Sequence, residues 1–407
     1  MTACLGYCMN IFPAPSYGQM LENLTTKPAG ILAALGRNQG NLGIGMWLAN
    51  PHLTTMQAKG EETWRREIEQ ALAVARADIF TLNGFPFGNF HAKQVKETVY
   101  HPNWSTAERL QYTLDLAEWL VRYGSQRPAY LSISTVPIAY RAHWQPPMAE
   151  VCAGHLVTLI CKLAELEDRC GKQVAVALEP EPDCVIDDLA STLTFWEEFI
   201  RRKVVPQLPR PTEEERERLL QRHLGICLDT AHCAVVGDDP LVMLEELRRN
   251  HIRVVKIQVS TAMFADVQSG NGAREILSGY GSDTYLHQTR VVPESGCQVI
   301  AYPDLPQALA APAPDGLWRI HYHVPITWEG EEGVLTSSRS LLSHQFFNTA
   351  VACGVEHFEI ETYTLPNFLS RTHQLENVIA EEIRIVESLS GLCATVDNPS
   401  FQGVPRT

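Results

Sequence analysis

Short apolar runs alternate with longer amphipathic stretches along most of this chain. In the stretches 63–77, 105–123 and 148–171 the apolar residues recur at the spacing of one helix face. The short runs are bounded by polar or turn residues, which is typical of buried strands. Strands that alternate with helices predict an α/β protein with a parallel sheet. The candidate strands lie at 5–10, 42–47, 78–84, 129–135, 173–180, 224–232, 254–260, 318–326 and 357–362.

Four of these strands end in a polar residue of a type that binds metal ions, namely Glu179, Asp229, Gln258 and Glu361. A large apolar residue precedes each one, and successive side chains of a strand point to opposite faces. The four polar residues therefore share one face. A parallel barrel turns one strand face to its axis, and catalytic groups lie at its C-terminal strand ends. The pattern predicts a (β/α)8 TIM barrel whose carboxylates converge on a divalent metal ion.

The length of the chain indicates an insertion in this barrel. At 407 residues it exceeds the roughly 250 that are typical of the fold, and the candidate strands outnumber the eight that a barrel needs. The stretch between strand seven and the last strand is far longer than one βα unit requires, and much of it is rich in Gly, Ser and Pro. We expect a loop excursion at about 262–340, with 318–326 as a strand or hairpin over the barrel mouth. The expected organisation is a single domain at 1–392 and a polar C-terminal tail at 393–407.

Composition narrows the classes of partner. Lys and Arg number 33 against 47 Asp and Glu, which gives a net charge of -14. Such a protein is poorly suited to a nucleic acid or an anionic membrane, so we expect a small-molecule metabolite as its ligand. The 11 cysteines, an odd number without a CxxC pair, are typical of reduced thiols. Because the chain also lacks a signal-peptide pattern and a membrane-length apolar run, we expect a cytoplasmic protein without membrane insertion. The sequence leaves the oligomeric state open.

Glu179 and Glu181 lie two residues apart in the run LEPEPD. A buried carboxylate is costly unless it is paired or bound to a cation. Glu179 is therefore either half of an ion pair with an interior Lys or Arg, or a metal ligand. The prolines that end the strand at the barrel mouth favour the ligand. Glu181 either contacts the substrate near this ligand or faces solvent.

Asp229 and His232 form a DxxH step at a strand end, where the chain turns and the two side chains converge. Asp229 is interpreted as a ligand, or alternatively as the cap of the next helix, with His232 an ordinary residue at the helix start. Gln258 also has two interpretations. Its amide oxygen is a fourth ligand, or the side chain is a core glutamine that bonds to a neighbouring strand or to a substrate hydroxyl.

His321 and His323 share one face of the strand at 318–326. Paired histidines are a common donor set for Zn or Mn, so His323 is a candidate ligand and His321 a candidate substrate contact. Ordinary packing is the alternative for both. Glu361 has a stronger position, because an acidic residue between Ile360 and Thr362 at a strand end has no packing role.

The loop after the strand at 78–84 carries further polar candidates among aromatic residues. We expect Asn83, His91 and Lys96 to bind a polar substrate at the barrel mouth. A surface loop with incidental charges is the alternative.

The runs ALEPEP, ICLDTAH and FEIET resemble the xylose-isomerase-like barrels, which include sugar-phosphate isomerases and epimerases and the related endonuclease IV. This resemblance implies a metal ion held by Glu179, Asp229, the strand-seven residue and Glu361, with His232 near the substrate. Strand seven carries Gln258 where epimerases of this kind usually have His. This difference affects both which metal ion is bound and which reaction is catalysed.

A closer similarity covers most of the chain. The runs LGYCMNIFP, TLNGFPFGNFH, VKETVY, PNW, SISTVP, ALEPEPDC, CLDTAHCAV and WRIHYHVPI resemble the EboE family, the metabolite traffic proteins of the ebo gene cluster. The resemblance implies a role in the biosynthesis or export of a secondary metabolite and association with other proteins of that cluster. It does not supply a reaction.

We expect an enzyme of isomerase or epimerase type that acts on a small polar, sugar-like metabolite. The metal ion, with Zn or Mn expected, polarises a carbonyl and its neighbouring hydroxyl. Either Glu179 or Glu361 removes the adjacent proton, and the other carboxylate returns it on the opposite face of the enediolate. His232 steadies the oxygen on which charge develops.

Two alternatives belong to other functional classes. A metal-dependent hydrolase of a small phosphoester would use the same ligands, with His323 holding a second metal ion. A non-catalytic protein that binds and carries a metabolite would keep the barrel mouth without turnover. Nucleotide-binding, serine-hydrolase and zincin motifs do not occur in a fitting context.

Overall fold

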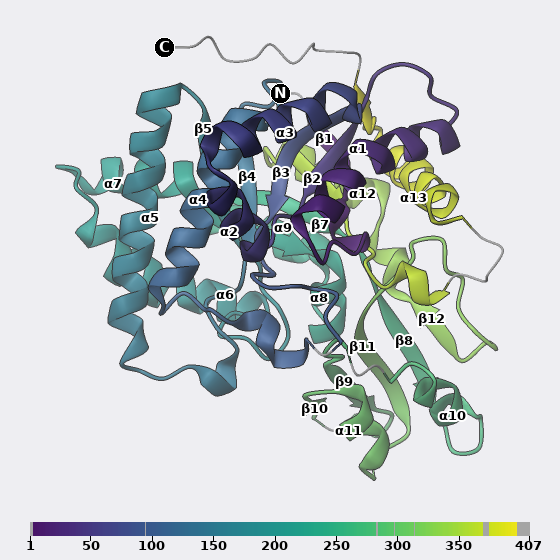
Figure 1. Ribbon diagram of the computed structural model, residues 1–407. Coiled ribbons are helices and arrows are strands. Elements are labelled where there is room, and N and C mark those ends of the chain that lie inside the picture. Colours follow the sequence, from purple (N-terminus) through teal and green to yellow (C-terminus); the bar gives the residue numbers. More distant parts are fainter. Residues whose placement is uncertain are drawn as a thin grey trace.

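The computed structural model describes residues 3–93, 95–281, 284–296, 298–312, 314–368 and 374–396. Eight parallel strands close into a barrel in the order β1, β13, β7, β6, β5, β4, β3, β2, and β2 pairs with β1 (Figure 1). The predicted TIM-barrel fold is confirmed. The strands are β1 (Cys4–Cys8), β2 (Asn41–Met46), β3 (Ala77–Asn83), β4 (Tyr130–Thr135), β5 (Gln173–Leu178), β6 (Leu224–Asp229), β7 (Val254–Val259) and β13 (His357–Ile360).

Helices surround the barrel and bury one apolar face each against it. In α5 (Met148–Cys170), for example, the buried residues Leu156, Ile160 and Leu163 recur at helical spacing and pack into the main core. The other helices are α1 (Tyr17–Ala34), α2 (Asn50–Lys59), α3 (Glu61–Ala75), α4 (Ala107–Tyr123), α6 (Leu189–Phe195), α7 (Glu213–His223), α8 (Thr230–Val236), α9 (Pro240–Arg249), α12 (His344–Ala352) and α13 (Leu375–Ser390). Within the described ranges, each helix is too short or too polar to cross a lipid bilayer.

A second sheet is inserted between β7 and β13 and projects from the barrel (Figure 1). It has five antiparallel strands in the order β10, β9, β11, β8, β12, and a core of its own around Met263, Trp318 and Ile320. Its elements are β8 (Thr261–Val267), α10 (Ala273–Ser278), β9 (Thr289–Pro293), β10 (Ile300–Tyr302), α11 (Leu305–Ala310), β11 (Gly316–Val324) and β12 (Leu335–Ser337). Where composition predicted a loop excursion, the chain forms a sheet, because the Gly- and Pro-rich segments are the connections between short strands.

The start of the expected C-terminal tail adds a short strand to the barrel. Strand β14 (Thr395–Val396) pairs antiparallel with β2, and Arg37 donates a hydrogen bond to Thr395 at 2.6 Å. The remainder of the expected tail, 397–407, lies outside the described residues.

Candidate active site

The C-terminal ends of the barrel strands bring three carboxylates together. Glu179 follows β5, Asp229 ends β6 and Glu361 follows β13, and all three are buried. The donor atoms of Glu179, Asp229 and His232 lie within 4.8 Å of one another, and so do those of Asp229, His323 and Glu361. Asp229 is therefore common to both sets, with Glu179 in one set and Glu361 in the other.

Asp229 has two roles in the structure, one for each carboxylate oxygen. Its Oδ1 accepts the backbone N–H of Ala231 at 2.7 Å, that of His232 at 3.0 Å and the hydroxyl of Ser260 at 2.7 Å. Its Oδ2 is buried and has no hydrogen-bond partner in the described part of the chain. Asp229 thus caps α8, as one interpretation expected, and still presents a free oxygen to the site. Burial works to raise its pKa, but His232, His323 and the donated hydrogen bonds lower it below the usual value.

Glu361 is oriented by two amides from other strands. Asn10, just beyond β1, and Asn83, at the end of β3, each donate from Nδ2 to its Oε1 at 2.7 Å. Burial first, and then Asp229 and Glu359, raise the pKa of Glu361 well above its usual value. Asn83, which was predicted as a substrate contact, contacts a candidate ligand and also lines the cavity described below. Asn10 was not among the predicted site residues, although it has the same strand parity as Asn83.

Glu179 is the second carboxylate without a full set of partners. Its Oε2 is buried and makes no hydrogen bond within the described ranges. Burial, and then the charges of Glu361 and Asp229, raise the pKa of Glu179 well above its usual value. The interior lysine that might have paired with it, Lys256, forms a fully buried ion pair with Glu359. Among the described residues, Glu179 therefore has no ion pair with a Lys or Arg, which the alternative interpretation required.

Gln258 lies in register with Asp229 on β6 and with Glu359 on β13. It is completely buried, and neither atom of its amide has a hydrogen-bond partner among the residues that the structure describes. The alternative of a core glutamine bonded to a neighbouring strand is thus not what the structure has. A buried amide without partners is costly, and a water molecule or an ion would satisfy it.

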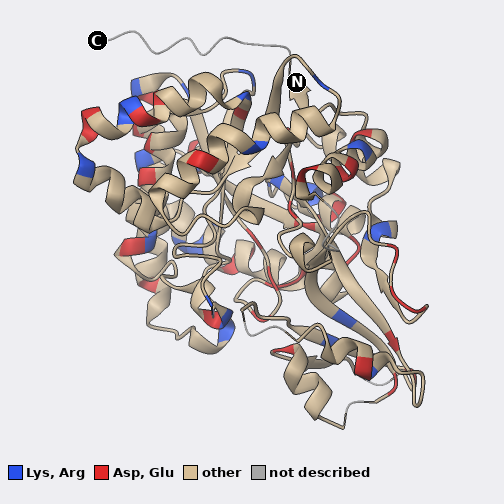
Figure 2. Cartoon of the chain, turned by 45° about the vertical axis from the view of Figure 1, so that its right-hand side comes forward, with Lys and Arg blue, Asp and Glu red and all other residues tan. Residues whose placement is uncertain are grey.

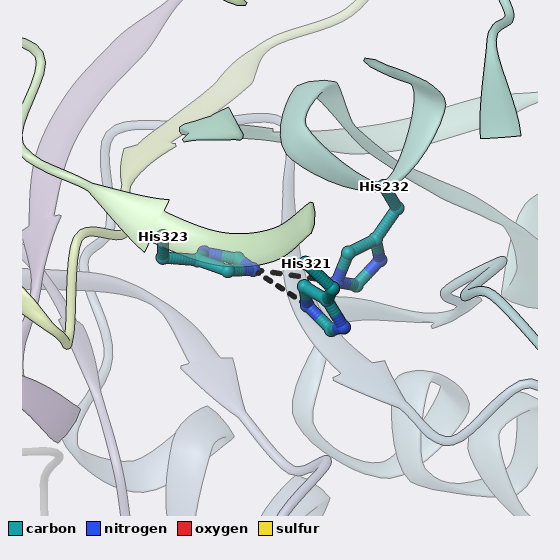
Figure 3. Close-up of side chains that lie close together, drawn as sticks. All are labelled: His232, His321 and His323. Carbon is teal, nitrogen blue, oxygen red and sulfur yellow. Dashed lines mark hydrogen bonds between the residues drawn. The ribbon is translucent and has the colours of Figure 1, made fainter. Parts of the chain in front are cut away.

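Three histidines converge beside the carboxylates (Figure 3). His232 comes from α8, and His321 and His323 come from β11 of the inserted sheet. Nε2 of His323 lies 3.2 Å from Nε2 of His321 and 3.4 Å from Nε2 of His232. Burial, opposed by Asp229, lowers the pKa of His232 to about 4. Burial and the other two rings lower the pKa of His321 well below its usual value, so His232 and His321 are neutral at pH 7.

The second nitrogen of His232 limits its chemical role. Its Nδ1 lies 2.8 Å from the carbonyl oxygen of Pro180, which only accepts, so Nδ1 carries the proton of the neutral ring. Nε2 then has a lone pair and no hydrogen. In this tautomer Nε2 does not donate a hydrogen bond, and the expected role of His232 in steadying a charged substrate oxygen stays a prediction.

A network of buried polar groups extends from Glu181 to the inserted sheet. Tyr100 donates its hydroxyl hydrogen to Glu181 at 2.6 Å, and Gln288 donates to the Tyr100 oxygen at 2.8 Å. The amide oxygen of Gln288 lies 2.6 Å from Nδ1 of His321. Burial raises the pKa of Glu181 to about 8, although the Tyr100 hydrogen bond lowers it in part. Sequence reasoning missed Gln288, which follows no motif, and Tyr100, whose only signal was its place in the mouth loop.

The other predicted substrate contacts hold the barrel to the insertion. His91 contacts the carbonyl oxygen of Asn10 at 2.5 Å and the hydroxyl of Tyr285 at 3.1 Å. Lys96 forms an ion pair with Asp304 at 2.6 Å. His91 and Lys96 are therefore engaged by protein groups, and Lys96 still lines the cavity.

A small cavity joins these groups. It leaves about 50 Å³ for the centres of water-sized molecules, enough for a few waters or a very small ligand. Aromatic residues of the β3 loop, the insertion and the β13 end form its apolar wall. Its lining includes Asn10, Asn83, Phe85, Phe90, Glu179, Glu181, His232, Tyr285, His321, His323, Glu361 and Tyr363.

The charged residues of the outer helices have both signs. Figure 2 shows Lys and Arg intermingled with Asp and Glu there, and the net charge of the chain is -14.

Comparison with known proteins supports the fold. A crystal structure of a xylose isomerase-like TIM-barrel protein from Mycobacterium smegmatis, in complex with magnesium, has a TM-score of 0.50 and 12% identity, and the match covers 96% of this chain and 97% of that one. The chain is a xylose isomerase-like TIM barrel in fold. No family model and no curated protein match it, so membership of the EboE family stays a prediction.

Other solved structures share this TIM-barrel fold at lower similarity. The probable 3-DHS dehydratase AsbF of Bacillus anthracis has a TM-score of 0.44 and 13% identity, over 94% of this chain and 98% of that one. The 3-keto-D-glucoside 4-epimerase YcjR of E. coli has a TM-score of 0.43 and 12% identity, over 95% of this chain and 100% of that one. These likenesses concern the TIM-barrel fold alone.

Proposed function

We propose that this chain is a metal-dependent enzyme of isomerase or epimerase type that acts on a small polar, sugar-like metabolite. The observation that carries the proposal is the placement of Glu179 and Glu361 in two donor sets that share Asp229, around a buried cavity. Two carboxylates at one reacting centre are what proton removal and return next to a carbonyl require.

The donor set fits a resident divalent cation. Three buried carboxylates lie close together, and Glu179 Oε2 and Asp229 Oδ2 lack partners among the described residues. A cation offsets the repulsion among the three carboxylates and binds the two oxygens that lack partners. Glu179, Asp229 and Glu361 would hold it, and carboxylates with neighbouring imidazoles suit Mn²⁺ or Zn²⁺. Such an ion, when bound, supplies polarisation of a substrate carbonyl and its adjacent hydroxyl.

The protein groups would divide the remaining work. One of Glu179 and Glu361 takes the proton from the carbon next to the carbonyl, and the other returns it to the opposite face. Asn10 and Asn83 hold Oε1 of Glu361, so Oε2 is the oxygen available for proton transfer. Glu181, with its raised pKa, is protonated at neutral pH and is suited to donate a hydrogen bond to a substrate oxygen.

A second candidate function is hydrolysis of a small phosphoester. The three histidines beside the carboxylates favour it, because paired metal ions are typical of phosphoester hydrolysis. A cavity whose described lysine is already paired with Asp304 is a poor phosphate site, so we rank this function second.

The test combines metal analysis with an assay for proton exchange. Protein purified without chelators is analysed for bound metal, then incubated in D₂O with a panel of ketoses, aldoses and their phosphates and followed by ¹H NMR. We expect bound divalent metal and deuterium incorporation at carbon for at least one sugar, with less bound metal and no incorporation in Asp229→Asn. Glu214→Gln, an exposed carboxylate on α7, is the matched control.

Three outcomes would overturn the proposal. Release of inorganic phosphate without deuterium incorporation would favour the hydrolase. Tight binding of a sugar with neither product would favour a carrier. Equal, negligible metal in the wild type and in Asp229→Asn would remove the basis of the mechanism.

A further inference from the structure

We infer that His232, His321 and His323 form a second metal site, for a zinc-type ion, next to the carboxylate site. The inserted sheet supplies two of its three ligands. The inference goes beyond the proposed reaction and does not depend on it, because it concerns only which ions the resting protein holds.

The spacing of the three imidazoles is that of a coordination sphere. The Nε2 atoms of His321 and His323 are 3.2 Å apart, and those of His323 and His232 are 3.4 Å apart. Nitrogens bound tetrahedrally to zinc at about 2.0–2.1 Å lie about 3.3 Å from one another. Figure 3 shows the three rings pointing toward a common point from α8 and β11.

The hydrogen bonds on the far side of the rings orient their Nε2 atoms toward one another. Nδ1 of His232 faces the Pro180 carbonyl at 2.8 Å, and Nδ1 of His323 faces the Glu361 carbonyl at 3.0 Å. Carbonyl oxygens only accept, so each Nδ1 donates to its carbonyl. The Nε2 atoms that meet in the centre are therefore the ring nitrogens left to bind a cation.

Nδ1 of His321 also donates a hydrogen bond, in this case to the oxygen of a side-chain amide. Its Nδ1 lies 2.6 Å from Oε1 of Gln288. The amide nitrogen of Gln288 donates to Tyr100 at 2.8 Å and to the Pro182 carbonyl at 3.1 Å, which fixes its oxygen toward His321. Metal-binding histidines characteristically donate their other N–H to a carbonyl or carboxylate, and all three rings do so here.

The number of donors exceeds what one tetrahedral ion takes. Six residues offer a ligand atom in three overlapping sets, whereas zinc takes four ligands and needs one position for water or substrate in a catalytic site. His232 and His323 also belong to the sets that contain carboxylates. Assigning all three imidazoles to one ion leaves Glu179, Asp229 and Glu361 for the other, so that imidazole and carboxylate donors serve different ions.

The test measures metal content in four forms of the full chain, each expressed in zinc-supplemented medium and analysed by mass spectrometry. We expect two equivalents of metal in the wild type, one in His321→Gln and one in Glu179→Gln. The control His344→Gln alters an exposed histidine at the start of α12 and is expected to keep two equivalents. Circular dichroism checks that each variant is folded.

A wild type that holds one equivalent, kept in His321→Gln and lost in Glu179→Gln, overturns the second site and leaves the proposed function standing. Absence of metal from every form overturns both. If His321→Gln fails to fold, zinc X-ray absorption of Glu179→Gln, which is expected to hold only the imidazole-bound ion, decides. Imidazole scattering that corresponds to three histidines per zinc supports the site, and fewer histidines overturns it.

Discussion

Removal of the ammonium group of Lys256 is predicted to be severely destabilising. Lys256 and Glu359 are both fully buried inside the barrel and form an ion pair with each other. The fit around the pair is tight, since a Cβ on Gly45 would meet Oε1 of Glu359 at 1.4 Å. In Lys256→Met the carboxylate of Glu359 loses its partner in a place that water does not reach. Breaking a buried pair from one side typically costs about 3–5 kcal/mol.

The double variant Lys256→Met with Glu359→Met tests the origin of that cost. Replacing a whole buried pair by apolar residues of similar size is often neutral, so the second change is expected to restore most of the loss. Urea denaturation followed by circular dichroism gives the free energy of unfolding of the wild type, both single variants and the double variant. The reasoning fails if Lys256→Met lowers the free energy of unfolding by less than about 1 kcal/mol. It also fails if the double variant is less stable than Lys256→Met.

Three further predictions concern the site and its surroundings. Asn83→Ala removes one of two amides on Glu361, so metal affinity measured by chelator competition should fall about 10–100-fold, and an unchanged affinity would argue against Glu361 as a ligand. Burial raises the pKa of Glu382 to about 7, so its contribution to stability is lost as pH rises from 4.5 through 7. Urea midpoints should fall over this range, less steeply in Glu382→Gln, and equal slopes would contradict the assignment. Lys96→Met breaks the ion pair with Asp304, so amide hydrogen exchange should quicken around 284–290, whereas Lys27→Met, which breaks the ion pair with Glu376 on α13, should leave that segment unchanged.

The strand ends were predictable because two short-range rules act together. Alternation along a strand fixes which residues share a face, and closure of a parallel barrel brings those faces to one mouth. Glu179, Asp229 and Glu361 follow from these rules without any knowledge of the loops. Asn10 has the same strand parity, but its amide contact with Glu361 became visible only in the structure.

The imidazole cluster was only half predictable. A shared strand face joined His321 to His323, and 318–326 was expected over the barrel mouth, but nothing in the sequence indicated its contact with His232. That contact depends on the fold of the insertion, whose short strands are hidden among Gly, Ser and Pro. Gln288 was invisible for the same reason, since its role comes from long-range contacts with Tyr100 and His321.

The placement of His321 and His323 on a wall of the cavity links substrate entry to metal affinity. Because the cavity has room for only a few waters, a larger molecule would need the β3 loop and the insertion to move apart. Such a movement would lengthen the distances among the three imidazoles, because β11 belongs to the insertion. A ligand that favoured this arrangement would then loosen the imidazole-bound ion, and by reciprocity that ion would oppose such a ligand by an equal free energy.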